Sequence, residues 1–389
     1  MAKVLFISHD ASRTGAPIVF LHLLRWLKAN SDISVRILLR EGGELEPEFE
    51  SVAPVSFFYK EPKLIRILIK ALNFLGLDIR YNPISLNLLK NKLSKENIDL
   101  IYANTVLSGS VLEFLSQFNC PVICHVHELE YIIRYYVGLE EFERVKRYSN
   151  QFIAVSEAVK SNLVENHNIA PEKIEVIYGF IPTISVDLDN IRQTRKQLSE
   201  QLNIPHDAKI VCASGTFDWR KGAELFIQLA HSTYKHDLNN PIYFLWVGGA
   251  SSGERFSQLK YDINKLGLER YVHFLGVQTN PLNLFAVCDV FVLMSREDPY
   301  PLVCLEAASL GKPIICFDKA GGEKEFVEDD CGFVVPYLDI EAMALKIKDL
   351  LNSPDLCQCF GQRAQQKVQE RHHVDIAGSQ VLKLIKQFL

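Results

Sequence analysis

Residues 210–223 read IVCASGTFDWRKGA: a short apolar run, a glycine-containing turn and the start of a helix-like segment. The apolar run Ile210–Ala213 has the length and the β-branched residues of a buried strand. The turn extends over Ser214–Gly222, and a helix is expected from Ala223. A strand followed by a turn and a helix is the repeating part of a βαβ unit, in which successive strands are parallel.

The same pattern recurs throughout the chain, which predicts parallel sheets with helices on both faces. The strands expected in the first half are Val4–Ile7, Val35–Leu39, Leu100–Ala103, Pro121–Cys124, Phe152–Val155 and Ile174–Ile177. Those expected after Ile210–Ala213 are Tyr243–Val247, Val272–Leu275, Val290–Met294, Pro313–Phe317 and Phe333–Val335. A polar and charged interval from Asp187 to Asp207 separates the two series.

We therefore predict an α/β protein with two doubly wound, Rossmann-like domains. A chain of 389 residues is long enough for both. The N-terminal domain is expected at residues 1–182, a linker at 183–207 and the C-terminal domain at 208–370. A C-terminal helix at 371–389 is expected to pack back on the N-terminal domain. Ligands of such sheets bind beyond the carboxyl ends of the strands, so the strand-to-helix turns should carry the chemistry.

The composition excludes several classes of protein. With 48% hydrophobic and 23% charged residues, the chain is neither collagen-like nor disordered. Its net charge of −5 gives no general attraction to nucleic acid or anionic lipid. The nine cysteines lie mostly in apolar stretches and are expected to be reduced. The first apolar run ends at Ser8, too soon for a signal peptide, and no run reaches the ~18 apolar residues of a membrane span. We expect a cytoplasmic protein.

Two turns combine a glycine with the start of a helix. Gly15 lies where the first expected helix begins, and free N–H groups at such a position favour an anion. A glycine kept only for packing is the alternative. In the second turn Arg220 and Lys221 precede a helix, where cations are unfavourable, so they suggest an anion to neutralise. A solvated pair is the alternative there. Neither GxGxxG nor GxxxxGK[ST] occurs, so the dinucleotide fingerprint and the Walker loop are absent from the sequence.

Two carboxylates follow the expected strand Val290–Met294. Asp298 lies in a proline-stiffened loop, and Glu306 lies on the helix after it. Carboxylates at this edge of a sheet suit the hydroxyls of a sugar or a ribose, because each can accept two hydrogen bonds. A helix-capping role would account for Asp298, but it accounts less readily for Glu306.

The sequence provides little support for a metal site. His125 and His127 end the strand Pro121–Cys124, and together with Cys120 and Cys124 they could suggest zinc. Strand alternation points Cys124 and His125 to opposite faces, and no second cluster follows. The run Asp187-Leu188-Asp189 resembles a metal-binding DxD, but it lies in the expected linker. We therefore predict neither a metal nor a cofactor.

A basic amphipathic stretch covers residues 63–72. Lys63, Arg66 and Lys70 share one helical face, and the opposite face is apolar. A core helix with a solvated basic face is the favoured interpretation. The alternative is peripheral contact of residues 63–72 with a membrane, toward a lipid-linked acceptor.

The stretch Asp298–Pro313 resembles the acidic-x7-Glu signature of retaining glycosyltransferases of family four, the group of glycogen synthase and related mannosyltransferases. These enzymes have the GT-B fold, in which two Rossmann-like domains face each other across a cleft that holds the donor. The resemblance covers most of the chain and is weakest at residues 40–98. Its other matches are Ala154-Val155-Ser156, Gly215 with Lys221-Gly222, Gly248-Gly249, Phe274-Leu275-Gly276, Ala320–Glu325 and Gly332–Pro336.

The resemblance implies roles for individual residues. Lys221 would pair with the diphosphate of the donor, and Glu306 would hold the ribose. The family's first glutamate aligns with Asp298, which would contact the sugar, and His127 matches the family's histidine that faces the sugar. The arginine often found after the first glycine is replaced by Thr216, and Arg220 would supply that charge instead. The other expected donor-binding residues are Gly15, Gly215, Tyr300, Leu302 and Val303, the last three through their backbone amides.

These roles imply a glycosyltransferase that moves a hexose from a nucleotide-diphosphate sugar with retention of the anomeric configuration. UDP-glucose is the expected donor, from its frequency in the family, and a polysaccharide or a lipid-linked saccharide is the expected acceptor. Catalysis would involve His127, Asp298, Lys221 and Arg220, because the two cations and a helix N-terminus would stabilise the leaving diphosphate without metal. A nucleotide-sugar epimerase of the same fold and a non-catalytic sugar-nucleotide-binding protein are the alternatives.

Overall fold

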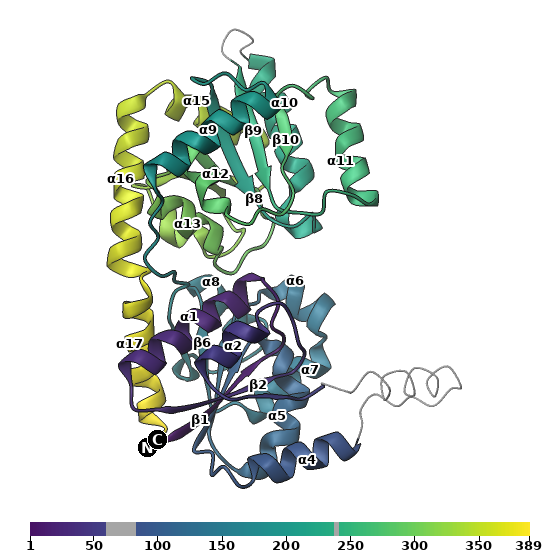
Figure 1. The fold of residues 1–389 in the computed structure, drawn as a ribbon, viewed down its shortest axis with the longest axis vertical. Helices are drawn as coiled ribbons and strands as arrows, with labels where there is room; N and C mark the ends of the chain where they lie inside the picture. The colour runs from purple at the N-terminus through teal and green to yellow at the C-terminus, as the bar shows by residue number, and fades with distance from the viewer. Residues whose placement is uncertain (60–82, 237–240) are drawn as a thin grey trace, which may run out of the picture. The chain divides into compact units, whose positions relative to one another are not determined.

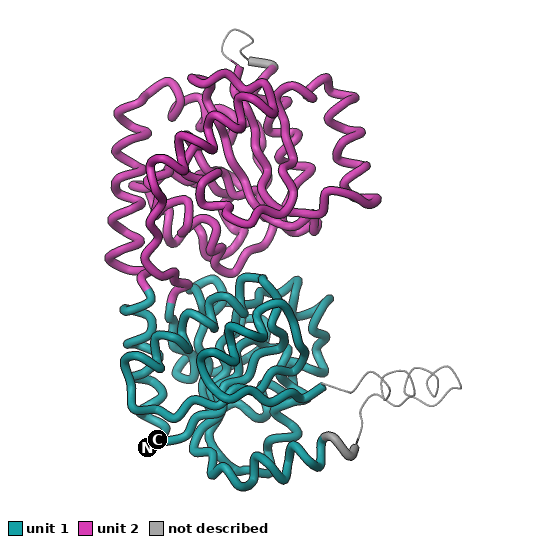
Figure 2. The backbone as a smooth tube through the Cα atoms, viewed as in Figure 1, with its two compact units in different colours: residues 1–177, 374–389 teal, residues 178–373 magenta. Residues whose placement is uncertain are grey.

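The computed structural model describes residues 1–59, 83–236 and 241–389, which form two units, each built around a parallel sheet (Figure 1). One unit consists of Met1–Ile177 and Val374–Leu389, and the other of Tyr178–His373 (Figure 2). The predicted fold class, α/β with two Rossmann-like domains, is confirmed. The basic stretch 63–72 lies outside the described residues.

The described part of the N-terminal unit contains a seven-stranded sheet in the order β3-β2-β1-β4-β5-β6-β7. All six strands expected here are present, and the short strand β3 is an addition. The register pairs Val4 with Val35 on one side and with Leu100 on the other. The strands are β1 (Lys3–Ser8), β2 (Ser34–Leu39), β3 (Val55–Phe57), β4 (Leu100–Asn104), β5 (Val122–Val126), β6 (Gln151–Ala154) and β7 (Ile174–Val176).

Helices cover both faces of this sheet. Val4, Leu5, Phe6 and Ile7 are all fully buried although successive side chains of a strand point to opposite faces. Helix α1 contacts α2 and α17, and α5 contacts α7. The helices are α1 (Gly15–Asn30), α2 (Glu46–Val52), α4 (Pro83–Leu93), α5 (Gly109–Leu115), α6 (Glu130–Ile132), α7 (Leu139–Tyr148), α8 (Glu157–Glu165) and α17 (Val374–Gln387). Shorter turns are η1 (Val106–Ser108), η2 (Ser116–Phe118), η3 (Ile133–Val137) and η4 (Pro171–Lys173).

The described part of the C-terminal unit contains a six-stranded parallel sheet in the order β10-β9-β8-β11-β12-β13. Its strands are β8 (Lys209–Ser214), β9 (Ile242–Val247), β10 (Val272–Phe274), β11 (Val290–Leu293), β12 (Ile314–Phe317) and β13 (Gly332–Val335). Its helices are α9 (Leu188–Leu202), η5 (Trp219–Lys221), α10 (Ala223–His236), α11 (Glu254–Lys265), α12 (Pro281–Val287), α13 (Leu302–Ser309), α14 (Glu323–Val327), α15 (Ile340–Leu351) and α16 (Pro354–Arg371). Each strand expected from its apolar run is present.

The interval expected to be a linker, 183–207, contains helix α9, which packs on α12. Leu198 is the one buried side chain of α9, so the rest of the helix is at least partly exposed to solvent and its sequence is polar. Asp187 caps this helix, since its carboxylate accepts a hydrogen bond from the N–H of Asp189 at 3.0 Å. The capping bond gives Asp187, the first acidic residue of the DxD-like run, a structural role.

Helix α17 packs on α1 within the N-terminal unit. The indole N–H of Trp26 donates a hydrogen bond to the Asp375 carboxylate at 2.7 Å, and Gly378 lies against the same indole ring.

None of the helices in the described residues combines the length and the apolar composition that a membrane span requires.

Gly378 is a position where a larger side chain would separate α17 from α1, because an added Cβ atom would lie 2.5 Å from Cδ2 of Trp26. We expect Gly378→Val to lower the free energy of unfolding by about 1–3 kcal/mol, the usual result of overpacking. Urea unfolding measures the effect. Ser379→Val, at the exposed next position of the same helix, is the matched control. If both variants were equally stable, the close packing of these helices would not limit the side chain at 378.

Candidate active site

The carboxyl ends of β8 and β11 form the charged part of the candidate site in the C-terminal unit. The turn after β8 leads into η5, where the Asp218 carboxylate accepts a hydrogen bond from the N–H of Arg220 at 2.9 Å. Gly222 ends η5 with a φ of +74°, and an added Cβ there would lie 2.2 Å from the backbone oxygen of Met294. Only glycine fits both the left-handed conformation and this close approach. The turn is thereby held against the end of β11.

A buried carboxylate receives the two cations of this turn. The ammonium group of Lys221 lies 2.5 Å from Oδ2 of Asp298, and the guanidinium of Arg220 lies 3.9 Å from the same oxygen. The hydroxyl of Ser295 donates to it at 3.2 Å. Burial alone would raise the pKa of Asp298, but the charges of Lys221 and Arg220 and the hydrogen bonds from Lys221 and Ser295 lower it overall. Asp298 is therefore ionised at neutral pH.

Arg220 and Asp298 also fix the loop between β11 and α13. The guanidinium of Arg220 donates to the backbone oxygen of Glu297 at 2.8 Å, and the N–H of Arg296 donates to the backbone oxygen of Arg220 at 2.7 Å. The N–H of Asp298 donates to the backbone oxygen of Ala320, after β12, at 2.7 Å. These bonds connect three neighbouring strand ends, so the charged groups are preorganised.

Helix α13 begins directly after this loop. The N–H groups of Leu302 and Val303 lie in its first turn, where they have no partner within the helix, and Pro301 provides no side-chain cap. Tyr300 is only 7% exposed, with its hydroxyl 3.3 Å from Nε2 of His372. Its side chain is thus part of the interior. The start of α13 presents backbone donors suited to an anion.

Glu306 lies on α13, and its carboxylate has no hydrogen-bond partner among the described residues. Burial raises the pKa of Glu306 to about 7. No hydrogen bond or ion pair of the described residues joins it to Lys221 or Asp298. The contacts thus join Arg220, Lys221 and Asp298 but not Glu306.

Two further predicted residues, Gly215 and Thr216, lie in the turn after β8. The backbone oxygen of Gly215 accepts a hydrogen bond from the Trp246 indole at 2.9 Å, and Thr216 is exposed.

The N-terminal unit gathers a second, mostly neutral group at the ends of β1, β4 and β5. His127 follows β5, and its Nε2 lies 2.9 Å from Oδ1 of Asn104 at the end of β4. The side-chain amide of Asn104 donates to the backbone oxygen of Ala16 at 3.2 Å. Ala16 follows Gly15, the exposed first residue of α1. Asn104 therefore links the glycine turn to the histidine, two features that the sequence indicated separately.

Sequence reasoning missed Asn104, Thr105 and Glu128. Thr105 has a φ of +100°, which is unusual for a β-branched residue and marks a strained strand end of a kind that clusters at functional sites. Glu128 is buried, and its carboxylate accepts hydrogen bonds from the N–H groups of His127 and Val106 at 2.9 and 3.4 Å. Burial raises the pKa of Glu128 to about 7, although these hydrogen bonds act in the opposite direction. Position in the sequence could have indicated Asn104 and Thr105, since both directly follow a predicted strand.

No group of three or more metal-binding side chains occurs within residues 1–59, 83–236 and 241–389. His125 is buried, with Nδ1 2.7 Å from the Tyr102 hydroxyl. All nine cysteines are free.

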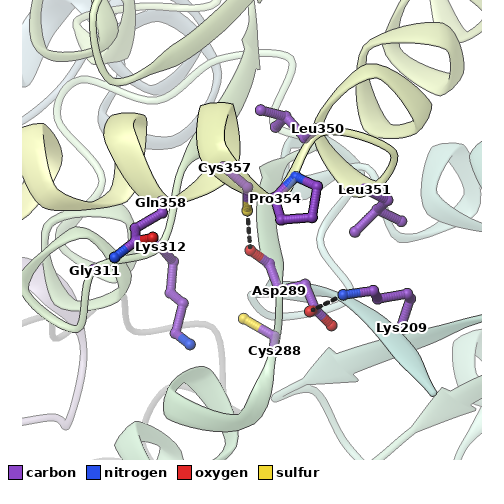
Figure 3. Close-up of a pocket in the computed structure, with 10 residues that line it drawn as sticks. All are labelled: Lys209, Cys288, Asp289, Gly311, Lys312, Leu350, Leu351, Pro354, Cys357 and Gln358. Carbon is purple, nitrogen blue, oxygen red and sulfur yellow. Dashed lines mark hydrogen bonds and ion pairs between the residues drawn. The ribbon is translucent and has the colours of Figure 1, made fainter. Parts of the chain in front are cut away.

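A cavity of about 260 Å³ lies at the amino ends of the C-terminal strands, away from the predicted site residues (Figure 3). Its charged groups are already paired. The Lys209 ammonium lies 3.2 Å from the Asp289 carboxylate, and the Lys312 ammonium donates to the backbone oxygen of Ala286 at 2.7 Å. Lys209, Asp289 and Lys312, the charged residues that line this cavity, thus all have partners within the protein.

Comparison with known proteins assigns the chain to a family. Residues 13–184 match the family described as Glycosyltransferase Family 4, and residues 194–367 match the family described as Glycosyl transferases group 1. The two matches together cover most of the chain. The protein belongs to the family-four glycosyltransferases with the GT-B fold.

Individual relatives agree with this assignment. The N-acetyl-α-D-glucosaminyl L-malate synthase of Bacillus anthracis is 24% identical over 286 residues, 71% of each chain. The N-acetylgalactosamine-N,N'-diacetylbacillosaminyl-diphospho-undecaprenol 4-α-N-acetylgalactosaminyltransferase of Campylobacter jejuni is 28% identical over 217 residues. That alignment covers 56% of this chain and only about half, 54%, of the Campylobacter protein.

Two solved structures show the same fold. The Anabaena protein HepE in complex with UDP-glucose has a TM-score of 0.82 and 22% identity, and both chains are covered completely. The sucrose-phosphate synthase of Thermosynechococcus elongatus has a TM-score of 0.76 and 20% identity, with 100% of this chain and 99% of that chain covered.

The raised pKa of Glu306 predicts a stability effect of pH. The folded state keeps a proton on Glu306 up to a pH of about 7, whereas an unfolded glutamate loses it near 4.5. Stability therefore falls as the pH rises through this window, and Glu306→Gln removes that loss. We expect Glu306→Gln to gain on the order of 2 kcal/mol relative to the parent protein between pH 5 and pH 8.

Urea unfolding of the ligand-free protein across this pH range measures the difference. Glu269→Gln, at an exposed position of the same unit, is the control. A stability difference between parent and Glu306→Gln that does not change with pH would contradict the buried, unpaired state of this carboxylate.

Proposed function

We propose that the protein transfers a hexose from UDP-glucose to a saccharide acceptor, with retention of the anomeric configuration and without a metal. The observation that carries this proposal is the contact of Lys221 and Arg220 with Asp298, directly before the uncapped start of α13. Two cations and several free N–H groups at one sheet edge suit a diphosphate.

Lys221 would exchange partners when the donor binds. In the ligand-free protein its ammonium group is held by one carboxylate, Asp298. A diphosphate carries more negative charge and presents several acceptor oxygens, so it competes for this ammonium group. Asp298 would keep the hydrogen bond from Ser295. Once Lys221 has moved away, the Asp298 carboxylate would accept hydrogen bonds from hydroxyls of the hexose.

Glu306 would hold the ribose. Its carboxylate lacks an internal partner, and a vicinal diol provides two hydroxyl donors for one carboxylate. Hydrogen bonds to the charged form lower the pKa of a carboxyl group, so nucleotide binding would ionise Glu306. In the N-terminal unit, His127 would contact the hexose, and Gly15 would leave room at the start of α1.

Catalysis would depend on stabilising the leaving group. The bond from the anomeric carbon to the diphosphate oxygen breaks, and negative charge accumulates on UDP. Arg220 and the first turn of α13 are held in place, and Lys221 would already contact the bound diphosphate, so these groups would stabilise that charge with little reorganisation. This is the role that a divalent cation fills elsewhere.

The relatives support the finer parts of the proposal. The structure of HepE contains UDP-glucose. The names of the Campylobacter and Bacillus enzymes specify α linkages, and an α product from an α-linked donor is retention. The Campylobacter name also specifies an acceptor linked to diphospho-undecaprenol, and a Staphylococcus aureus relative takes part in capsular polysaccharide biosynthesis. We therefore propose a polysaccharide or a lipid-linked saccharide as the acceptor.

Nucleotide binding tests the assigned residues. Calorimetry with UDP alone should show affinity about 10–100-fold weaker for Lys221→Ala, because a charge-assisted hydrogen bond is lost. Glu306→Ala should also bind UDP more weakly, even without a sugar. Lys209→Ala is the matched control, since Lys209 is likewise paired with an aspartate but lies at the opposite ends of the strands. UDP affinity equal to that of the control would remove the assigned role from either residue.

Turnover tests the reaction. With UDP-glucose alone and a chelator present, we expect slow release of UDP and free glucose, which accelerates when saccharide acceptors are added. Product analysis by NMR should show α-linked glucose. Conversion of UDP-glucose to its epimer would favour an epimerase, absence of any turnover with intact binding would favour a binding protein, and inhibition by the chelator would refute the metal-free mechanism.

A further inference from the structure

Asn104 occupies a fully buried position between two predicted site elements. It is the last residue of β4, which lies between β1 and β5 in the sheet. Its side chain makes one contact to each side, to the backbone oxygen of Ala16 at 3.2 Å and to Nε2 of His127 at 2.9 Å.

The contact with Ala16 fixes which way the Asn104 amide points. A backbone carbonyl oxygen only accepts hydrogen bonds, so the Asn104 atom that faces Ala16 must be the NH₂ group. The reversed amide would place two acceptor oxygens against each other in a buried position, which is unfavourable. The Asn104 oxygen consequently faces His127. Because that oxygen only accepts, Nε2 of His127 must carry a proton.

The surroundings keep the His127 ring neutral, so the ring has just this one proton. Burial lowers the pKa of His127 to about 3, and the nearby His9 acts in the same direction. The ring of His125 lies 4.2 Å away, and its burial likewise lowers the pKa of that histidine. Glu128 bonds the backbone N–H of His127, and among the described residues no carboxylate accepts a hydrogen bond from the ring. Nδ1 therefore has a free lone pair.

We propose that Asn104 is a positioning residue that holds the proton of His127 on Nε2, so that Nδ1 accepts a hydrogen bond from a hydroxyl of the donor hexose. The identity of that hydroxyl-bearing ligand rests on the proposed function, whereas the tautomer rests on the contacts of Asn104 with Ala16 and His127 and on the burial of the His127 ring. His127 then acts on the sugar as an acceptor and not as a proton donor.

Long-range ¹⁵N–¹H NMR of the histidine rings tests the tautomer in the ligand-free protein. We expect a protonated Nε2 and an unprotonated Nδ1 for His127 from pH 6 to pH 8, with the signals assigned by their loss in His127→Gln. In Asn104→Asp the carboxylate would favour the doubly protonated ring, so Nδ1 should gain a proton within this range. Asn91→Asp adds the same charge on the exposed face of α4 and should leave the spectrum unchanged.

Binding separates this proposal from the proposed function. Asn104→Asp should bind UDP-glucose about tenfold more weakly and UDP as well as the parent does, because the change lies in the N-terminal unit, whereas the UDP part is assigned to residues of the C-terminal unit. An Nδ1–H tautomer in the parent protein would overturn the proposal, even if Asn104→Asp failed to fold. The expected tautomer with unchanged UDP-glucose affinity in Asn104→Asp would overturn the role in sugar binding. If the parent showed the expected tautomer but bound no UDP-glucose, the proposed donor would be wrong and the tautomer would stand.

Discussion

The charge on Asp298 is the constraint on which the carboxyl edge of the C-terminal sheet depends. A buried carboxylate is stable only when cations and hydrogen-bond donors surround it, and removing them leaves an uncompensated charge. Lys221 and Arg220 meet this requirement, so the turn after β8 must lie against the loop after β11. The two cations before the helix thus have an internal anion, Asp298, in the ligand-free protein. The sequence alone suggested only an anion to neutralise, and the family resemblance assigned Lys221 to the diphosphate of the donor. In the ligand-free protein both cations are therefore held at this edge of the sheet.

This internal pairing has a chemical consequence for the proposed reaction. A lysine with no partner would be free to move in solvent, whereas Lys221 is held by Asp298. In the proposed reaction, a ligand of higher charge would draw the ammonium group of Lys221 away from this carboxylate. This competition would make binding selective for a diphosphate, because a singly charged or neutral ligand would gain too little from Lys221 to replace the carboxylate. Asp298 would then be released for the sugar at the same step.

The strands could be predicted because each is buried on both faces and its apolar run is therefore continuous. Strand β3 was missed because it has three partly exposed residues, Val55–Phe57. Helix α9 was taken for a linker because it is largely exposed. Lys221, Asp298 and Glu306 followed from residue types at strand ends and from a family resemblance. The partnership of Asn104 with His127 could not be predicted, since it depends on the order in which β1, β4 and β5 lie side by side.

The two units differ in their electrostatics in a way that matches the two halves of a sugar nucleotide. The C-terminal site is built from ion pairs and helix N–H groups, and it suits the anionic half. At the N-terminal site, burial lowers the pKa of His9 and His127, so this surface offers neutral donors and acceptors. A hexose carries no charge and many hydroxyls, so neutral groups of fixed polarity can distinguish one sugar from another better than charges can. In the proposed function, donor specificity would therefore depend on the tautomers and amides of the N-terminal unit, and affinity would depend on the cations of the C-terminal unit.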